Sequence, residues 1–409
     1  MSQKALRSST KAIRATIHLP SSKSESNRAL IIGAYSSGLA QIENLSDAKD
    51  TVTLERLLRE KPEEMDVGHA GTAMRFLTSY LAFQPRDYVL TGSARMQERP
   101  IGPLVDALRK IGAEINYMVR EGYPPLMIHG RNARFGDKEV EIPGGISSQY
   151  ISSLLMLAPT LTDGLGITLT GEIRSRPYIE MTLRLMERFG VAHSWEGRRI
   201  HVPRQAYRAG TYAVEADWSS ASYWYCLAAL ADEAEIELPG LRRDSWQGDQ
   251  AIVELMAGLH VATEWTADGV KLVKRRGDLP EELRWDFSGC PDLAQGVLVA
   301  MAVLGVRGEF TGLESLRIKE TDRIAALQNE LGKFGVALEE EDGMKGKLWT
   351  LSGEFTARPA EIPTYHDHRM ALAFAPLALH VEGLVILEPD VIVKSYPSYW
   401  ADLEKAGIS

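Results

Sequence analysis

Residues 147–202, SSQYISSLLMLAPTLTDGLGITLTGEIRSRPYIEMTLRLMERFGVAHSWEGRRIHV, contain the pattern that decides the fold. The stretch begins at Ser147 with small polar residues, and a helix pattern of small and apolar residues follows. An amphipathic helix pattern then ends at Gly190, which suits a left-handed C-terminal cap. The alternating run HSWEGRRIHV after it predicts a β-hairpin. The stretch therefore predicts one unit of strand, helix, strand, helix and hairpin.

This unit recurs along the chain. Five other segments begin with a cluster of small or charged residues followed by an apolar helix pattern. The equivalent points, which lie 47, 76, 71, 74 and 75 residues apart, are Ser24, Gly71, Ser147, Trp218, Asp292 and Asp367. The interleaved amphipathic helices end at Gly112, Gly190, Gly258, Gly335 and Gly407. The first interval is short because LERLLREKPEEMDVG (54–68) runs directly into the next motif, so we predict that the first unit has lost its hairpin.

The repeat spacing predicts an α/β fold with two lobes of three units each. A period of roughly 70 residues is too long for a small solenoid repeat. We expect one lobe to contain residues 1–15 and 216–409 and the other to contain residues 16–215. The alternative is a set of generic α/β units without symmetry, and the near-constancy of four steps disfavours it.

Composition excludes several classes of protein. The 409 residues include 46 Lys and Arg against 55 Asp and Glu, a formal net charge of −9, whereas nucleic-acid-binding proteins usually present a basic face. No apolar run approaches the ~18 residues of a membrane helix, and residues 1–20 lack the apolar core of a signal peptide. Two cysteines make no disulfide framework. We expect a cytoplasmic protein without a nucleic-acid or membrane partner.

Basic residues gather beside the predicted helix starts. A helix N-terminus leaves backbone N–H groups free and carries partial positive charge, so it attracts anions. The cations beside these starts, or in short motifs near them, are Lys23, Arg28, Arg75, Arg99, Arg317, Lys319, Arg323, Arg369 and Lys394. Simple capping explains any single helix start, and a solvated charge run would explain RIKETDR (317–323). Six equivalent starts instead favour a site for an anionic ligand.

Standard cofactor and metal motifs are absent from the sequence. It has neither a G-x-x-x-x-G-K-[ST] loop nor a G-x-G-x-x-G fingerprint. His366-Asp367-His368 has no accompanying C-x-x-C, H-E-x-x-H or matching carboxylate set. Cys226 falls in an apolar helix pattern, and nothing near Cys290 indicates a thiolate. We expect no cofactor and no metal.

Nine motifs together resemble the 5-enolpyruvylshikimate-3-phosphate (EPSP) synthase family. They follow the family's order from about residue 22 to 400, and they are SKSESNRAL (22–30), AGTAMR (70–75), QERPIGPLVDAL (97–108), SSQY (147–150), SRPYIEMT (175–182), PD (291–292), RIKETDR (317–323), DHRMAL (367–372) and IVKSYPSYW (392–400). The resemblance implies an inside-out α/β barrel in each lobe and an active site in the cleft between the lobes. It also implies transfer of an enolpyruvyl group from phosphoenolpyruvate to the 5-hydroxyl of shikimate 3-phosphate, with release of phosphate.

The resemblance also implies the site residues, carried over motif by motif. Phosphoenolpyruvate is expected to bind Lys23, Gly71, Arg99, Gln149, Arg323, Arg369 and Lys394. Shikimate 3-phosphate is expected to bind Lys23, Ser24, Arg28, Ser147, Ser148, Gln149, Ser175, Tyr178, Asp292, Ser315 and Lys319. Asp292 and Glu320 are the candidates for proton transfer, with Lys23 assisting the departing phosphate and His368 as a supporting donor. Glu320 could instead serve only in an ion pair with Arg323 or Lys319. We expect a monomer acting on these two small molecules.

The chain departs from the family pattern at three positions. His69 and Phe76 replace a common Asn and Pro around AGTAMR, and Ser315 replaces a frequent Asn. Gly71 is retained, so we expect sensitivity to glyphosate, which occupies the phosphoenolpyruvate site in this family. One alternative is the sister enzyme acting on UDP-N-acetylglucosamine, which generally carries a Cys in the loop matching residues 92–100. The other is a non-catalytic anion-binding homologue.

Overall fold

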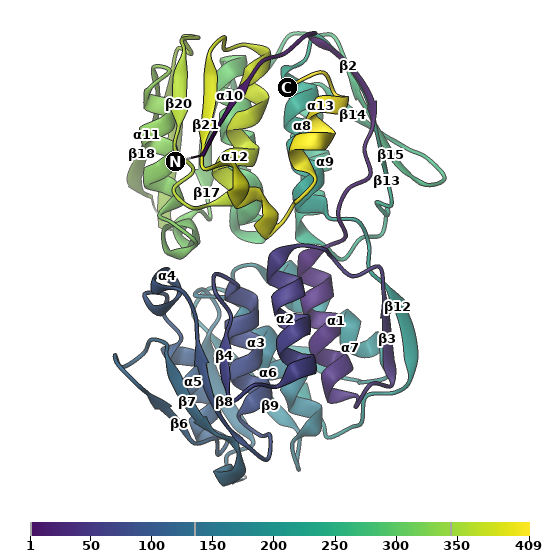
Figure 1. Ribbon diagram of the computed structural model, residues 1–409, viewed down its shortest axis with the longest axis vertical. Helices are drawn as coiled ribbons and strands as arrows, with labels where there is room; N and C mark the ends of the chain where they lie inside the picture. Colours follow the sequence, from purple (N-terminus) through teal and green to yellow (C-terminus); the bar gives the residue numbers. More distant parts are fainter. Residues whose placement is uncertain (1, 135, 344–345) are drawn as a thin grey trace. The chain divides into compact units, whose positions relative to one another are not determined.

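The chain forms two compact units of mixed α/β structure. The computed structural model describes residues 2–134, 136–343 and 346–409. Residues 21–214 make up one unit, called here the central unit. Residues 1–20 and 215–409 make up the other, called the terminal unit. Figure 1 shows both units, with the helices labelled in chain order.

The described residues of the central unit form three sheets. The first sheet contains, in spatial order, β4 (Glu64–Asp66), β5 (Asp87–Thr91), β7 (Leu126–His129) and β6 (Ile115–Tyr117). The second contains β8 (Glu139–Pro143), β9 (Leu165–Thr170), β11 (Arg199–Val202) and β10 (Ser194–Glu196). The third has only β12 (Gly210–Ala213) and β3 (Ala40–Glu43).

The described part of the terminal unit also forms three sheets. The first contains β2 (Ala12–Thr16), β13 (Glu233–Pro239), β15 (Gly269–Lys274) and β14 (Val261–Trp265). The second contains β16 (Glu282–Asp286), β17 (Arg307–Thr311), β19 (Gly346–Gly353) and β18 (Val336–Gly343). The third contains β20 (Ala360–Ile362), β21 (Leu384–Leu387) and β1 (Gln3–Leu6).

All four-stranded sheets have the same topology, as the repeat predicts. In each of them the first two strands are parallel, and the second strand pairs antiparallel with the last strand of the hairpin. In the β8 sheet, for example, Glu139 lies opposite Gly166, and Thr168 lies opposite Arg199. The predicted order of strand, helix, strand, helix and hairpin is therefore confirmed along the chain in three of these units. In the fourth, the first strand is β2, which lies far before α8 in the sequence.

Two families of helices alternate along the chain. Those that start the repeats are α1 (Lys23–Tyr35), α3 (Gly71–Leu81), α6 (Ser148–Leu157), α8 (Trp218–Leu230), α10 (Ala294–Leu304) and α12 (His368–Phe374). The amphipathic family comprises α2 (Lys49–Glu60), α5 (Gly102–Lys110), α7 (Arg176–Arg188), α9 (Ile252–Ala257), α11 (Arg323–Gly332) and α13 (Tyr399–Lys405), and the short α4 (Ala94–Gln97) precedes α5.

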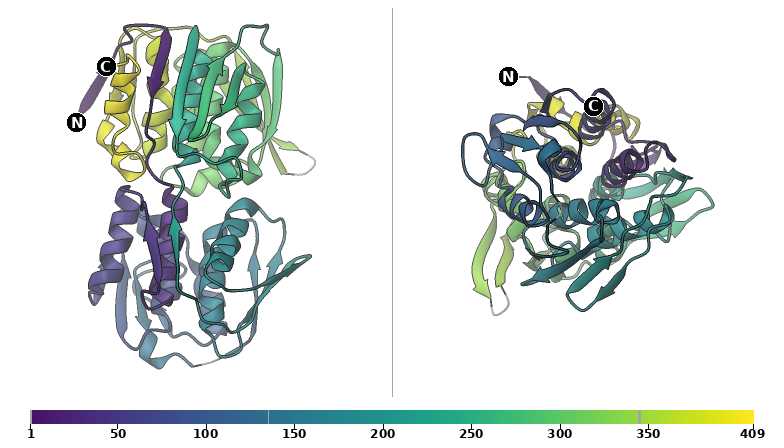
Figure 2. Two further views of the ribbon diagram at one scale, coloured as in Figure 1. Left: turned by 90° about the vertical axis from the view of Figure 1, so that its right-hand side faces the viewer. Right: turned by 90° about the horizontal axis from the view of Figure 1, so that it is seen from below.

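The first family occupies the interior of each unit. A helix that is apolar on all sides must be covered on all sides, and nearly every residue of α8, α10 and α12 is buried. Figures 1 and 2 show the helices of each unit lying between its sheets. The small residues of these helices, Ala, Ser and Gly, allow this close packing.

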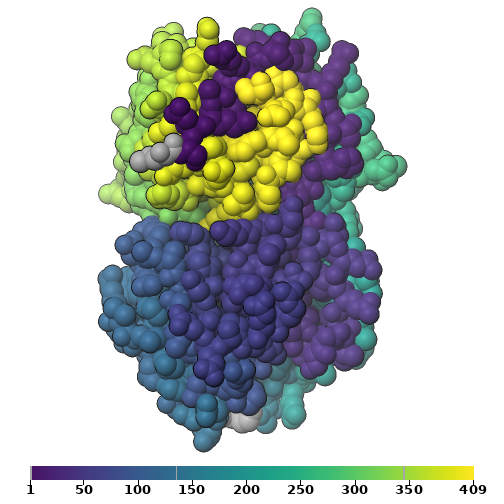
Figure 3. Space-filling view, viewed as in Figure 1, coloured from purple at the N-terminus to yellow at the C-terminus, as the bar shows by residue number. Residues whose placement is uncertain are grey.

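Within the described residues, two of the six units lack a hairpin of their own, and one of these two is completed by another strand. In the last unit, β1 pairs antiparallel with β21 and takes the place of the missing hairpin strand. Figure 3 shows the N-terminal segment lying against the C-terminal one. In the first unit, α2 ends at Glu60 and β4 begins at Glu64, which confirms the predicted loss of the hairpin. The described strands leave the second edge of β3 without a partner.

One predicted helix cap is wrong. Gly112, Gly190, Gly335 and Gly407 have the positive φ of a left-handed cap, but Gly258 has φ −65°. In that unit His260 takes the left-handed conformation instead, with φ +63°. The chain turns two residues later because Gly258 and Leu259 continue the last turn of the short helix α9, with backbone bonds to Leu255 and Met256. No helix among the described residues combines the length and the apolar character needed to cross a lipid bilayer.

A comparison of two glycines tests the role of the cap. Both Gly112 and Gly38 have positive φ, but a Cβ on Gly112 would lie 1.4 Å from the Arg134 carbonyl oxygen, whereas one on Gly38 meets nothing within 4 Å. Gly38→Ala should lower the unfolding free energy by about 1 kcal/mol through backbone strain alone. Gly112→Ala must also displace backbone, and we expect a loss of more than about 3 kcal/mol. Urea unfolding followed by circular dichroism measures both losses, and equal losses would contradict this account.

Candidate functional site

In the central unit, the starts of three inner helices lie side by side. The Gln149 side-chain amide donates to the Thr72 hydroxyl at 3.2 Å, which joins the first turns of α6 and α3. Ser22 caps α1 and Ser147 caps α6, each accepting a bond from a backbone N–H of the first turn. The free N–H groups of these first turns, together with the helix dipoles, favour negative charge. This end of the central unit is therefore suited to anion binding.

Arg99 adds a cation at the start of α3. Its side chain is largely buried, with 8% of the residue exposed. A Cβ on Gly71 would lie 2.8 Å from one terminal nitrogen of the Arg99 guanidinium. Glycine at the first position of α3 thus lets the guanidinium pack directly against the helix start.

Arg28 is deeply buried in the central unit. Only 2% of it is exposed. The guanidinium donates to the Thr182 hydroxyl at 2.7 Å, the Ser24 carbonyl at 2.9 Å and the Ser152 hydroxyl at 3.2 Å. Burial lowers the pKa of Arg28 to about 10, so it stays protonated at neutral pH. Arg28 therefore joins α1, α6 and α7 near their N-terminal halves.

The departures around AGTAMR have partners in the structure. Phe76 is buried, and the Arg28 guanidinium lies 5.5 Å from the centre of its ring, close enough for a cation–π contact. The Nδ1 atom of His69 lies 3.0 Å from the Ser93 hydroxyl. Phe76 is thus part of the packing around α3, whereas His69 is exposed and bonds to the residue that precedes α4.

Two features of the central unit were not evident from the sequence. The Lys23 ammonium pairs with the Asp50 carboxylate at 3.4 Å, and Asp50 is a buried residue in the first turn of α2. Ser175 precedes α7 with φ +52°, and Tyr178 lies in the first turn of α7, where the Arg28 guanidinium approaches its ring. The close spacing of Lys23 and Asp50 in the shortened first unit is the feature of the sequence that could have indicated their ion pair.

In the terminal unit, Arg323 is the centre of a buried ionic network. Its guanidinium donates to Asp367 at 2.7 Å, to Glu320 at 2.8 Å and to Asp292 at 2.9 Å. Only 1% of Arg323 is exposed. Arg323 is the first residue of α11, Asp367 caps α12, and Asp292 precedes α10, so one side chain connects three helix starts.

Further cations surround the same carboxylates. Lys394 donates to Glu320 at 2.6 Å, and Arg369 donates to Asp292 at 2.8 Å. The Lys319 ammonium lies 3.8 Å from Asp292. The ion pair between Glu320 and Arg323, which we considered from the sequence, is therefore present, and Lys394 shares the same carboxylate.

The network fixes the charge states of its members. Burial alone would raise the pKa of Asp292, but Arg369, Lys319 and Arg323 together hold it well below its usual range. Asp367, Glu320 and Asp292 raise the pKa of Arg323 against the opposing effect of burial. Asp292 is thus ionised at neutral pH and can accept hydrogen bonds, but it is a weak base.

Asp249 is a member of this cluster that sequence reasoning missed. It lies in the turn before α9, is 2% exposed, and accepts a hydrogen bond from the Ser219 hydroxyl. Ser219 in turn lies 3.5 Å from the Arg369 guanidinium. Burial, reinforced by the nearby Asp292 carboxylate, raises the pKa of Asp249 to about 6. No motif marks this residue, because its partners come from α8 and α12.

The remaining predicted residues of the terminal unit lie near the network. His368 is buried in the first turn of α12, with Nδ1 3.4 Å from the Asp367 carboxylate. Ser315 lies in a 3-10 turn, Glu314–Ile318, just before Lys319. In the part of the chain that the structure describes, no three His, Cys, Asp or Glu side chains are grouped as metal ligands.

Comparison with known proteins identifies the family. The family model for EPSP synthase (3-phosphoshikimate 1-carboxyvinyltransferase) matches residues 8–62 and 54–403. The chain belongs to the EPSP synthase family. A 3-phosphoshikimate 1-carboxyvinyltransferase from Bacteroides fragilis (strain YCH46) is 51% identical over 405 residues, covering 98% of this chain and 97% of that protein. One from Sulfurovum sp. (strain NBC37-1) is 38% identical, covering 96% of both proteins.

Solved structures of EPSP synthases and other enolpyruvyl transferases share the fold. An EPSP synthase from Acinetobacter baumannii matches with a TM-score of 0.74 at 22% identity, covering 100% of this chain and 99% of that one. The enolpyruvyl transferase NikO from Streptomyces tendae matches with a TM-score of 0.73 at 14% identity, covering 100% and 98%.

Asp249 should give the protein a measurable pH dependence of stability. With a pKa near 6 when folded, against an ordinary value of 3.8, the carboxyl keeps a proton that the unfolded chain has already lost. The stability contributed by this proton is present at acidic pH and is lost as the pH rises through about 6. Between about pH 5 and pH 7.5 we expect this group to lower the unfolding free energy by roughly 1 kcal/mol.

The variant Asp249→Asn removes this dependence. Relative to the wild-type protein, its unfolding free energy should therefore rise by roughly 1 kcal/mol across that pH range. The exposed Asp244→Asn is the matched control and should follow the wild type. Denaturant titrations at the two pH values measure the differences, and a parallel change in all three proteins would refute the assignment.

Proposed function

We propose that this chain transfers the enolpyruvyl group of phosphoenolpyruvate to the 5-hydroxyl of shikimate 3-phosphate and releases phosphate, the activity of a 3-phosphoshikimate 1-carboxyvinyltransferase. The observation that carries the proposal is the 51% identity to a protein of that name across nearly the whole chain. The cations that the reaction needs are present in both units. Lys23 begins α1 and Arg99 packs against the start of α3, whereas Arg323 and Arg369 lie in the first turns of α11 and α12 and Lys394 ends a 3-10 helix.

Both substrates are small polyanions, and we propose that the two clusters act on them together. Lys23, Arg99, Arg323, Arg369 and Lys394 bind phosphoenolpyruvate, with Gln149 and the Gly71 backbone assisting. Shikimate 3-phosphate is held by Lys23, Ser24, Ser147, Ser148, Gln149, Ser175, Tyr178, Asp292, Ser315 and Lys319. Arg28 also binds shikimate 3-phosphate in this proposal, and its bonds to Thr182, Ser24 and Ser152 fix the position of its guanidinium.

The reaction proceeds by addition and then elimination. In the addition, the 5-hydroxyl oxygen bonds to C2 of phosphoenolpyruvate and loses its proton, while C3 gains a proton. In the elimination, C3 loses a proton, the bond between C2 and the phosphate oxygen breaks, and phosphate departs. This chemistry needs acid–base groups and fixed positive charge. Lys23 and the other cations stabilise the departing phosphate.

The charge states support a division of labour between the two carboxylates. Three cations keep Asp292 ionised, so it is suited to accept a hydrogen bond from a ring hydroxyl and orient it. Glu320 lies 2.6 Å from the Lys394 ammonium, a geometry in which a proton can pass between carboxylate and amine. We assign the proton transfer at C3 to Glu320 with Lys394, and His368 supports the network through Asp367.

The finer architecture and setting follow from the same proposal. We propose that the three sheets around the inner helices of each unit form an inside-out α/β barrel, and that the chain works as a monomer on small molecules. Cys226 and Cys290 are both free and buried, which supports a reducing compartment such as the cytoplasm.

Phosphate release tests the proposal directly. With phosphoenolpyruvate, the protein should release phosphate when shikimate 3-phosphate is added and not when UDP-N-acetylglucosamine is added. Glyphosate should inhibit in competition with phosphoenolpyruvate. Phosphate release only with UDP-N-acetylglucosamine would identify the sister reaction. Phosphate release with neither acceptor would indicate a non-catalytic homologue, and either outcome would contradict the proposal.

Two substitutions separate chemistry from binding. Glu320→Gln keeps the shape of the side chain but removes its acid–base function, and we expect kcat to fall by about 10²-fold or more with KM for shikimate 3-phosphate little changed. Lys319→Ala removes a point charge next to Asp292 and should mainly raise KM for shikimate 3-phosphate, by about tenfold. Steady-state kinetics with both substrates varied distinguishes the two, and the opposite pattern would show that the roles are exchanged.

A further inference from the structure

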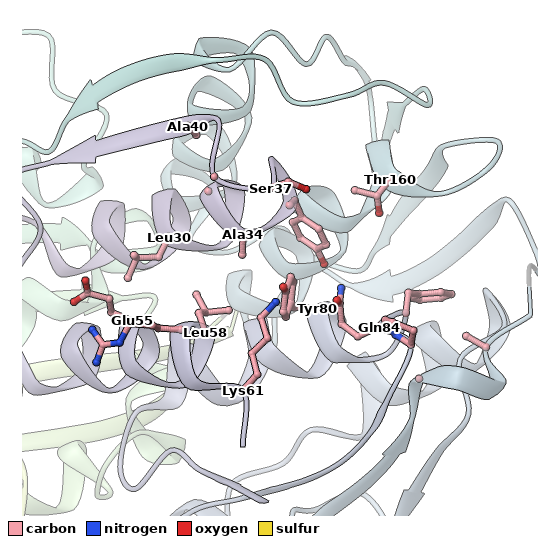
Figure 4. A pocket seen from close by; sticks show the side chains of 18 of the residues that line it. Leu30, Ala34, Ser37, Ala40, Glu55, Leu58, Lys61, Tyr80, Gln84 and Thr160 are labelled. Atoms are coloured by element: carbon pink, nitrogen blue, oxygen red, sulfur yellow. The ribbon is translucent and has the colours of Figure 1, made fainter. Parts of the chain in front are cut away.

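The central unit contains a large cavity far from the helix starts. It has a volume of about 1180 Å³ and is lined by residues near the C-terminal ends of α1, α2 and α3, by the turn that follows β7, and by Thr160 and Leu161 after α6 (Figure 4). Helix α1 has 13 residues, so its two ends are about 20 Å apart. A molecule in this cavity would not overlap the cluster around Lys23 and Arg99.

The cavity lies where the first unit has lost its hairpin. In the four complete units, the second strand is covered on its far edge by the last hairpin strand. The equivalent strand of the first unit is β3, which pairs with β12 alone among the described strands. Ala40 and Ile42 of β3 line the cavity. The cavity is therefore a consequence of the shortened repeat. In the complete units, the hairpin strand covers the edge that is left open at β3.

The walls of the cavity suit an apolar ring. The aliphatic and aromatic lining includes Leu30, Ala34, Ile42, Leu58, Phe83 and Leu161. Tyr35 and Tyr80 pack edge to face with ring centres 5.3 Å apart and form an aromatic wall. Small-molecule sites are typically of this kind, mostly apolar with a few placed polar groups.

The charged residues of the lining favour an anion. Arg59, Lys61, Arg131 and Arg134 line the cavity, against a single carboxylate, Glu55. Arg59 pairs with Glu60 and Arg131 pairs with Asp87. Among the residues that the structure describes, no carboxylate lies within ion-pair distance of Lys61 or Arg134.

Lys61 is aimed into the cavity. Residue 61 follows the last turn of α2, where a cation could simply neutralise the helix dipole. Its ammonium instead lies 5.9 Å from the centre of the Tyr80 ring, and Figure 4 shows the Lys61 side chain pointing toward Tyr80. One Arg134 terminal nitrogen donates to the carbonyls of Asn132 and Ala133, which holds the guanidinium at the rim.

We propose that this cavity is a second binding site, which takes a small organic anion with an apolar ring. The ring lies between the Tyr35–Tyr80 wall and the aliphatic residues of α1, β3 and α2, and Lys61 and Arg134 bind the carboxylate or sulfonate. The proposal is independent of the reaction proposed above, because its test measures binding alone.

Calorimetric titration with 2-naphthoate tests the site. We expect saturable binding that persists in excess phosphoenolpyruvate, and binding weakened about tenfold for the neutral 2-naphthamide. Lys61→Ala and Arg134→Ala should each weaken naphthoate binding by up to about tenfold, and Ala34→Trp should abolish it by filling the cavity. The matched control is Arg56→Gln, which removes an exposed cation from α2 outside the lining.

Several outcomes would overturn the proposal. Displacement of naphthoate by phosphoenolpyruvate would place the binding at the helix starts, and equal affinity in all variants would place it elsewhere on the surface. Absence of saturable binding to the folded wild-type protein would remove the site. Circular dichroism of each variant establishes folding. Sedimentation that showed a dimer of the wild type, broken by Ala34→Trp, would instead make the cavity a contact between two copies of the chain.

Discussion

The architecture depends on one constraint, which is that inner helices such as α8, α10 and α12 are buried on every side. Such a helix has no face to present to water, so each unit must surround it with other helices and sheets. Packing several of these helices side by side brings their starts together, as the bond between Gln149 and Thr72 shows in the central unit. The free N–H groups and dipoles then add at one end. Anion binding follows from the same pattern that drives burial.

Concentrated positive charge has to be balanced within the protein. Arg323 is nearly fully buried, and its contacts with Asp367, Glu320 and Asp292 offset the large desolvation penalty of a guanidinium. The same contacts tie α10, α11 and α12 to each other at their starts. A network of this kind adds little net stability, because the desolvation of its charges offsets most of their mutual attraction. Its main effect is to fix the geometry of the charged groups. Precise placement of charge is what a reaction between two polyanions requires.

The sequence predicted the units well because each depends on local patterns. Hairpins after Gly112, Gly190 and Gly335 appear where alternation and glycine predicted them. Features that depend on distant partners could not be predicted in this way. Strand β1 completes a sheet with β21. In this pairing Leu6 lies opposite Leu384, which is more than 370 residues away in the sequence. Asp249 and Asp50 lie in no motif, and their importance comes from burial beside charges on other elements. The bonds of Arg28 could not be predicted either, because Thr182 and Ser152 lie on other helices.

The two incomplete units show how a repeat protein tolerates the loss of a hairpin. The free edge of β21 is covered by β1, which closes the last sheet with the opposite end of the chain. No described strand covers the free edge of β3, but this strand is short and contains only Ala40–Glu43. A short edge limits the exposed backbone and so limits unwanted pairing with other chains. The hairpin's removal also takes away the side chains that would fill the space beneath it. A void lined only by aliphatic groups would favour collapse, whereas charged groups such as Lys61 and Arg134 resist it because they must stay solvated or meet an anion.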